Sequence, residues 1–364
     1  MANFNLTKMA LNMFCPGNVA QLDDAGLPSI LVWIPAFRLC DVLNTTDESI
    51  HPAFIVNGRQ IPGFYYSKYQ NVVHDGKAYS LPAEDPKTWV NFDDALGHCE
   101  AKGYGWHLST AAEWGAIALW CKKNGFLPYG NNSYGKDNRE NDMKAIPATY
   151  NNDGSVARVA TGTGPLTWSH DQTSSGIWDM NGNVWEWQGG IRSVWGELQI
   201  LADNDAADPD NPQNATSTCW KAIRAADGVL VNPECASDGE AVLSGSTIRL
   251  DYVSDVWTYT NSITDATDQA RNCAFGKLAC STAISETAKL LLRALALLPD
   301  EGSTENDYDG DLFGWTNGTA ESCVYRGGDW FYGVSAGVFR AYGSESRNSS
   351  SSNLGFRASY IPNI

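Results

Sequence analysis

One short aromatic segment constrains the fold of this chain more than any other. Residues 176–187 have the sequence GIWDMNGNVWEW, in which residues 179–183 form a turn sequence whose glycine can adopt a positive φ. After the turn, Trp185 and Trp187 alternate around Glu186. A strand would therefore bury both rings on one face and point the carboxylate to the other. The segment predicts a tight turn that leads directly into a strand.

Two helices are expected upstream of this segment, near residues 92–102 and 110–123. Thr110 and Glu113 have the spacing of a capping box, in which the hydroxyl and the carboxylate each accept a hydrogen bond from a free backbone N–H. From Trp114 onward, apolar residues recur at i, i+3, i+4 and i+7. The second helix is therefore expected to bury one face.

The rest of the chain predicts strands, loops and one long interruption. Residues 30–70 are β-branched and aromatic runs separated by Pro and Gly, which is typical of short strands. Residues 197–312 differ from the rest of the chain in their sequence pattern and include a helix expected at 284–298. We interpret them as an insertion that either packs beside the main domain, 30–364, or contributes trimer or ligand contacts. Residues 1–29 are expected to form either an arm that attaches to a neighbouring subunit or a frayed terminus.

Charge, hydropathy and cysteine usage exclude several classes of protein. The formal net charge of −17 argues against nucleic acid as a partner, because nucleic-acid binders present basic surfaces. Residues 1–10 do not resemble a signal peptide, and the longest apolar run, 30–37, is too short to cross a bilayer. Cys273 and Cys280 could pair, but free thiols in a reducing cytoplasm are favoured. We expect a protein that folds in the cytoplasm and does not insert into membranes.

Three motifs occur in a fixed order along the chain. The first joins residues 89–95 to 106–114, the second is the aromatic segment at 176–187, and the third joins 326–330 to 353–357. Together they resemble formylglycine-generating enzymes and their relatives. The resemblance implies an α+β, C-type-lectin-like fold of the formylglycine-generating-enzyme/sulfatase-modifying-factor type, with a long insertion. It also implies that the two helices flank a small, twisted antiparallel sheet.

The same resemblance bears on metals and catalysis. Some relatives hold calcium at the second motif through backbone carbonyls and its acidic residue, here Glu186, although a purely structural role is favoured and no cofactor is required. The catalytic relatives depend on two cysteines after the third motif, because copper–thiolate chemistry performs their oxidation. The matching positions here are Tyr332 and Gly337, and the nearest cysteine, Cys323, precedes the motif. Neither matching residue can form a thiolate or bind a soft metal, so we expect a protein that is not an enzyme.

Two alternatives stay open at this point. One is a divergent enzyme of the formylglycine-generating or sulfoxide-synthase type, although the His-rich helical domain of the sulfoxide synthases is missing from the sequence. The other is a carbohydrate-binding lectin that uses calcium. The Glu-Pro-Asn and Trp-Asn-Asp triplets of calcium-dependent lectins are absent, which argues against the second alternative.

The C-terminal segment, residues 326–360, carries a second resemblance. Its sequence is rich in Tyr, Ser, Gly, Asn, Arg and Phe, the residue types that antibody loops use for binding, although a serine-rich surface loop would also give this texture. Its motifs at 326–330, 336–339, Arg347 and 355–357 resemble the variable region of diversity-generating-retroelement proteins, such as phage tropism determinants. The resemblance implies a hypervariable region that a rigid C-type lectin scaffold displays for ligand binding and receptor recognition.

The resemblance also implies which side chains face outward and what they bind. The expected partner is a protein or glycan ligand on a target cell surface, and oligomers of the family imply a homo-oligomer that gains avidity. The implied location is a phage tail or a bacterial cell surface. The scaffold residues expected beneath the surface are Trp330, Val338, Phe339, Leu354 and Phe356. The residues expected to bind ligand are Phe331, Tyr332, Val334, Ser335, Arg340, Tyr342, Ser344, Ser346, Asn348, Ser349, Ser350 and Ser351.

Overall fold

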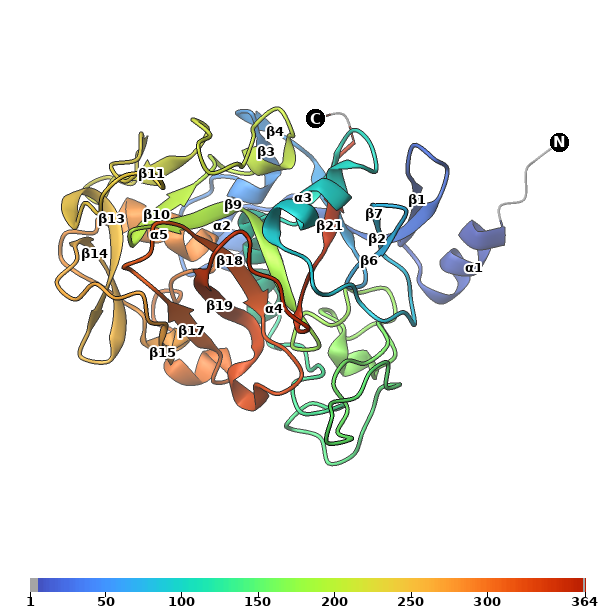
Figure 1. Cartoon of the computed structure of the whole chain (residues 1–364). Helices are drawn as coiled ribbons and strands as arrows, with labels where there is room; N and C mark the ends of the chain where they lie inside the picture. The colour runs from blue at the N-terminus through green and yellow to red at the C-terminus, as the bar shows by residue number, and fades with distance from the viewer. Residues whose placement is uncertain (1–5, 363) are drawn as a thin grey trace.

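The computed structural model describes residues 6–362 and residue 364. Figure 1 shows a mixed α and β architecture in which few helices accompany many strands. In the described part of the chain the helices are α1 (Leu6–Phe14), α2 (Leu39–Val42), α3 (Phe92–Glu100), α4 (Ala111–Lys123) and α5 (Glu286–Ala294).

The smaller of the two main sheets joins the two ends of the chain. Its order is β1-β2-β5-β21-β8, and all of its described pairs are antiparallel. The C-terminal strand therefore lies between strands from the first third of the chain. The strands are β1 (Val19–Leu22), β2 (Pro28–Pro35), β5 (Gly63–Ser67), β21 (Ala358–Tyr360) and β8 (Trp106–Leu108).

The larger sheet has the order β15-β17-β19-β18-β9-β10-β13-β14-β16, and three further strands pair beside this path. These strands are β9 (Trp185–Val194), β10 (Glu197–Ile200), β11 (Lys221–Ile223), β12 (Leu230–Val231), β13 (Ser244–Val253), β14 (Val256–Ser262), β15 (Arg271–Ala274), β16 (Ala279–Cys280), β17 (Leu312–Trp315), β18 (Ser322–Gly327), β19 (Gly337–Glu345) and β20 (Leu354–Phe356). Two short hairpins are separate, β3 (Ile55–Val56) with β4 (Arg59–Gln60) and β6 (Val72–His74) with β7 (Lys77–Tyr79).

The size and strand directions of the larger sheet correct the expectation of a small antiparallel sheet. Strand β20 pairs with β9 in the parallel direction, and so do β17 with β19 and β14 with β16. The α+β, C-type-lectin-like fold class is confirmed, but the sheet is longer than expected because strands of the 197–312 segment extend it.

Helices α3 and α4 confirm the two expected helices and flank the strands as expected. Asn91 caps α3 by accepting from the backbone N–H of Asp94. Thr110 and Glu113 form the reciprocal capping box at the start of α4. Helix α3 packs against β7 and β8, and α4 packs against β9 and α5.

Helix α5 is shorter than expected, because it ends at Ala294 instead of near residue 298. After the helix, Ala296 has a φ of +49°, which stops the helical path. The carbonyl oxygens of Leu295 and Ala296 each accept a hydrogen bond from the buried guanidinium of Arg326. The chain turns here because a side chain satisfies these carbonyls in place of a further helical turn.

Residues 197–312 share a core with the rest of the chain. Ile117 of α4 and Ile191 of β9 are buried in the same cluster as Leu250, Phe275 and Leu292 of this segment. Strand β10 continues the sheet by pairing with β9 through a tight turn. In Figure 1 the yellow and orange strands of this segment lie at the side opposite the N-terminal helix.

The N-terminal residues 1–29 are partly built into the fold. Residues 1–5 lie outside the described part of the chain, and β1 pairs antiparallel with β2 over four residue pairs. The latter part of this segment is thus an edge strand. All nine cysteines are free thiols, as favoured from the sequence. Among the described residues, no helix has the length and apolarity that a membrane crossing requires.

Candidate functional site: an aromatic pocket on a buried polar scaffold

The turn at 179–183 brings three distant segments together. Gly182 has a φ of +75°, and an added Cβ would lie 2.2 Å from the carbonyl oxygen of Asn131. Asn183 also has a positive φ, and its side-chain amide donates to Gln70 Oε1 at 2.8 Å. The turn thus requires glycine, as the sequence predicts, and its neighbouring amide holds residue 70 against it.

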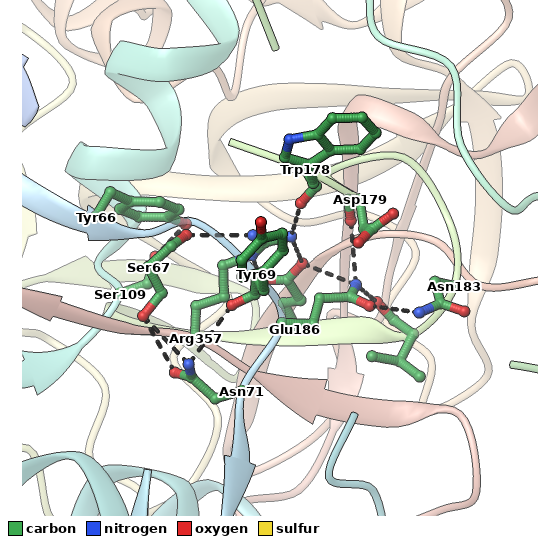
Figure 2. Close-up of polar contacts among 12 residues, drawn as sticks. Tyr66, Ser67, Tyr69, Asn71, Ser109, Trp178, Asp179, Asn183, Glu186 and Arg357 are labelled. Atoms are coloured by element: carbon green, nitrogen blue, oxygen red, sulfur yellow. Dashed lines mark hydrogen bonds and ion pairs between the residues drawn. The ribbon is translucent and has the colours of Figure 1, made fainter. Parts of the chain in front are cut away.

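Beneath the turn lies a buried ion pair between Glu186 and Arg357 (Figure 2). Arg357 Nε and Nη2 donate to the two carboxylate oxygens at 2.7 and 3.0 Å. Arg357 Nη2 also donates to the carbonyl of Trp178 at 2.6 Å, and Gln70 Nε2 donates to Glu186 Oε1 at 3.0 Å. Both charged side chains are fully buried. The pair ties the third motif to the second.

This ion pair bears on calcium at the second motif, because Glu186 is the candidate ligand there. Burial raises the pKa of Glu186, and the positive charge of Arg357 opposes that effect. A carboxylate ligand of calcium needs an oxygen that faces the ion, but both oxygens of Glu186 already accept hydrogen bonds from Arg357 and Gln70. Three of the four lone-pair sites of this carboxylate are thus taken within the protein, which supports the structural role of Glu186, and calcium binding by it stays a prediction. Within the described residues, no group of three or more His, Cys, Asp and Glu side chains could hold a metal ion.

Above the polar network, strand β9 places Trp185 and Trp187 on its opposite face, as the alternation predicts. Both rings are buried in one apolar cluster with Tyr325 of β18. Tyr325 faces Trp187 across the β9–β18 pair and faces Tyr342 across the β18–β19 pair. Three adjacent strands thus carry one continuous layer of aromatic rings.

The residues expected to form the scaffold of the C-terminal segment are buried, which confirms that part of the interpretation. The exposed fractions do not exceed 5% for any of the five scaffold residues, Trp330, Val338, Phe339, Leu354 and Phe356.

The twelve residues expected to bind ligand are not equally accessible. Exposed positions are Phe331, Val334, Ser346, Asn348 and Ser350. Half-buried positions are Tyr332, Ser335, Tyr342, Ser344, Ser349 and Ser351.

Arg340 is the exception, because its side chain is buried with an exposed fraction of 2%. The loop at residues 328–336 covers it, and Arg340 Nη1 donates to the carbonyl of Ser335 at 2.6 Å. Its guanidinium carbon lies 4.1 Å from the ring centroid of Tyr332 and 4.8 Å from that of Trp185. The expectation of an exposed Arg340 is therefore wrong, because the guanidinium supports the rings from within the fold.

Five of the expected residues meet at one pocket of about 290 Å³, which we call the aromatic pocket. Phe331 does not line it but stacks on Tyr332, with ring centroids 4.7 Å apart. Val334 instead lines a second, smaller pocket of about 160 Å³ beside Gly337. The residues that line the aromatic pocket are Trp185, Tyr325, Tyr332, Tyr342, Glu345, Ser349, Ser350, Ser351, Asn353 and Leu354.

Sequence reasoning missed Trp185, Tyr325, Glu345 and Asn353 as lining residues, and assigned Leu354 only to the scaffold. Trp185 comes from the second motif, far from the C-terminal segment in sequence, and Tyr325 directly precedes the third motif. The signal that would have identified Tyr325 is strand register, because it faces Tyr342 on the neighbouring strand.

The serine-rich edge of the pocket is anchored to the scaffold. Arg347 Nε and Nη2 donate to the carboxylate of Glu321, and its Nη1 donates to Asp93 Oδ1 at 2.7 Å. The carbonyl of Ser351 accepts from the backbone N–H of Trp89 at 2.9 Å. The loop at 346–352 is therefore held at both ends before any ligand arrives.

The two positions that match the catalytic cysteines hold no group able to perform thiolate chemistry. Tyr332 lines the aromatic pocket, and Gly337 begins β19. An added Cβ at Gly337 would lie 2.1 Å from Asp311 Oδ1, so this carboxyl fills the side-chain space. Burial raises the pKa of Asp311 to about 7. Cys323, the nearest cysteine in the sequence, is fully buried, and burial raises the pKa of its thiol well above the ordinary value.

A family comparison matches residues 13–223 to the sulfatase-modifying factor enzyme 1-like domain. The chain belongs to this family. The match covers the first two motifs, whereas the third lies beyond its end. The sulfatase-modifying factor family thus accounts for the helix pair, the turn at 179–183 and the strand that carries Trp185 and Glu186.

Solved structures similar to this chain are distant from it. PvdO from Pseudomonas aeruginosa is 13% identical with a TM-score of 0.36, over 92% of this chain and 94% of PvdO. Variable protein 1 from Treponema denticola is 12% identical with a TM-score of 0.33, over 95% of this chain and all of the other (100%). The P3c variant of the Major Tropism Determinant is 10% identical with a TM-score of 0.29, over 91% of this chain and 62% of that protein. A comparison with curated proteins gave no match.

Proposed function

We propose that this chain is a non-enzymatic binding protein whose aromatic pocket and surrounding C-terminal residues bind a ligand or receptor. The observation that carries the proposal is the convergence of Tyr332, Tyr342 and Ser349–Ser351 on one pocket floored by aromatic rings from β9 and β18. Tyrosine combines a large apolar face with a hydroxyl, and it is enriched among the residues that dominate binding energy.

The scaffold supports this role because it holds the binding surface in place, so the surface loses little conformational entropy when a ligand binds. Leu354 and Phe356 are buried under the segment, and Arg347 anchors the serine-rich loop to Glu321 and Asp93. A surface held in its binding conformation loses little further freedom when a ligand arrives. A homo-oligomer would present several copies of the pocket and raise a weak single-site affinity through avidity.

The ligand that suits this surface is a protein or glycan on a target cell. The chain would act as part of a phage tail or of a bacterial cell surface, where receptor recognition occurs. The alternative is a divergent oxidising enzyme, because the family includes enzymes. Tyr332 and Gly337 argue against that alternative, since neither supplies a thiolate for copper.

The experiment that tests the proposal presents fluorescently labelled protein to a panel of intact bacterial strains. We expect saturable binding to at least one strain and competition by excess unlabelled protein. In parallel, the protein is incubated with copper(I), oxygen and a sulfatase-type cysteine peptide. We expect no formylglycine above a no-protein control by mass spectrometry. Turnover above that control would contradict the proposal and establish the enzyme alternative.

A further inference from the structure

The walls of the aromatic pocket consist largely of ring faces. Trp185 meets Tyr325 with centroids 4.8 Å apart at an interplanar angle of 85°, and it meets Tyr332 at 5.3 Å and 74°. Tyr342 lies 5.4 Å from Tyr325 with the rings tilted by 32°. Because these rings meet at steep angles, the faces of neighbouring rings point into the same pocket. Each ring face carries a partial negative charge from its π-electrons.

A carboxylate lines the same pocket. None of the hydrogen bonds or ion pairs of the described residues involves the Glu345 side chain. After burial, the charge of Glu345 is among the causes that raise the pKa values of Tyr325 and Tyr332, so this charge acts on both hydroxyls. The pocket therefore combines an unbalanced negative charge with aromatic walls.

A strand irregularity places Glu345 in the pocket. Cys323 pairs with Glu345 and Tyr325 pairs with Tyr342, so two steps along β18 correspond to three steps along β19. In a regular strand, residues three apart point to opposite faces. The extra residue in β19 corrects this mismatch and allows Tyr342 and Glu345 to line the same pocket.

No cationic side chain balances Glu345 from within the pocket. The described lining residues include no Lys, Arg or His, and the remaining polar groups are serine hydroxyls and the Asn353 amide. Arg340 stacks beneath Tyr332 and Trp185 and is nearly inaccessible, and Arg347 is paired with Glu321 and Asp93. Asp311 and Asp329 also act on the Arg340 charge. The open side of the pocket thus presents negative charge and π-faces to solvent.

Resting on the proposed function, we propose that the aromatic pocket binds an alkylammonium cation, with methylated ammonium preferred over primary ammonium. Aromatic rings around a cation attract it through their π-electrons, and an adjacent carboxylate adds direct charge pairing. A methylated ammonium gives up little hydration and makes contact with ring faces through its methyl groups. At about 290 Å³ the pocket lies just below the range of drug-sized sites, about 300–1,000 Å³, so it suits a head group or one side chain.

The test uses isothermal titration calorimetry on the full chain with choline chloride, ethanolamine hydrochloride and 3,3-dimethyl-1-butanol at matched ionic strength. The last compound replaces the quaternary nitrogen by carbon and keeps the shape. We expect choline to bind about tenfold more tightly than the neutral isostere, the scale of a desolvated cation–π contact. Ethanolamine should bind more weakly than choline.

Two pocket variants and one matched control test whether the preference for choline over the neutral isostere arises in the aromatic pocket. Glu345→Gln removes the charge and keeps the side-chain size, and Tyr342→Leu replaces a ring by an aliphatic group. Both should reduce the preference for choline over the isostere to less than about threefold, with the loss concentrated in the choline affinity. Glu240→Gln makes the same charge change at an exposed position outside the pocket and should leave the preference intact.

The outcomes separate this inference from the proposed function. Equal binding of choline and the isostere would overturn the cation inference while leaving a ligand-binding pocket in place. Absence of choline binding, or a preference unchanged by both pocket variants, would also overturn it. A choline preference that depends on Glu345, combined with cell binding that does not require the pocket tyrosines, would keep the cation site and reject the proposed function.

Discussion

Arg357 and Glu186 form a two-point ion pair inside the protein, with Arg357 Nε 2.7 Å and Nη2 3.0 Å from the carboxylate oxygens. The pair lies next to the parallel contact of β20 with β9, in which Phe356 faces Trp187. On the other face of β9 lie the rings that floor the aromatic pocket. The ion pair thus fixes the platform on which the binding surface is built.

Removal of one partner of this pair should destabilise the protein strongly. Arg357→Met leaves the Glu186 carboxylate buried without its guanidinium, and we expect the free energy of unfolding to fall by about 3–5 kcal/mol. Arg38→Met breaks an exposed pair with Glu48 and should cost less than about 1 kcal/mol. Chemical denaturation of both variants provides the comparison. Similar small losses for both would show that the buried pair does not hold the platform.

The division between scaffold and surface predicts opposite results for two phenylalanines. Phe356 is fully buried, whereas Phe331 has an exposed fraction of 46%. Phe356→Ala should lower the free energy of unfolding by about 3–5 kcal/mol because it leaves a cavity. Phe331→Ala removes the same atoms from the surface and should cost about 1 kcal/mol or less. If thermal or urea denaturation ranks the two variants in the reverse order, the assignment of the scaffold is wrong.

The pKa of Asp311 predicts a pH dependence of stability. Burial raises this pKa from 3.8 to about 7, so the folded state binds the proton more tightly than the unfolded state. The resulting stabilisation is complete below the unfolded pKa and is lost as the pH rises through about 7. Asp311→Asn keeps an acceptor for the Phe339 N–H and cannot ionise. Its stability advantage over the wild type should therefore grow between pH 4 and 7.

Two histidines oppose this trend, so the difference between variant and wild type is the quantity to measure. Burial lowers the pKa values of His51 and His170 to about 4, which makes the wild type gain stability as the pH rises through this range. Both proteins carry these histidines, and their contribution cancels in the difference. A difference in melting temperature that stays constant from pH 4 to 8 would show that Asp311 does not titrate as proposed.

Features governed by short-range chemistry could be predicted from the sequence. The capping box of Thr110 and Glu113 requires residues three apart, and the turn at Gly182 requires a positive φ. The alternation of Trp185 and Trp187 likewise follows from strand geometry alone. Each of these features depends only on residues a few positions apart in the sequence, and the structure confirms each of them.

Features governed by long-range register could not be predicted in the same way. Arg340 and Tyr342 lie two residues apart on β19 and so point to the same face of the strand. Arg340 is nevertheless buried, because Tyr332 and Ser335 of the loop at 328–336 contact its guanidinium, whereas Tyr342 is half-buried. The irregularity in β19 brings Glu345 to the side of the strand that faces the pocket. No residue pattern in the strand predicts this irregularity. Tyr325 and Tyr342 lie side by side only because β18 pairs with β19. This strand pairing is a property of the whole fold.

Ligand binding by the aromatic pocket is tested most directly by comparing two tyrosine pairs for binding to a bacterial strain that the wild-type protein recognises. Tyr332→Ala/Tyr342→Ala removes two pocket walls, whereas Tyr134→Ala/Tyr150→Ala removes two exposed tyrosines outside the pocket. Loss of a dominant contact costs about 2 kcal/mol, so we predict that the pocket pair weakens binding at least about 30-fold. The outer pair should bind like the wild type, with both variants folded at the assay temperature. Unchanged binding by the pocket pair would show that the aromatic pocket does not bind the ligand and would place the binding surface elsewhere, including on residues 197–312.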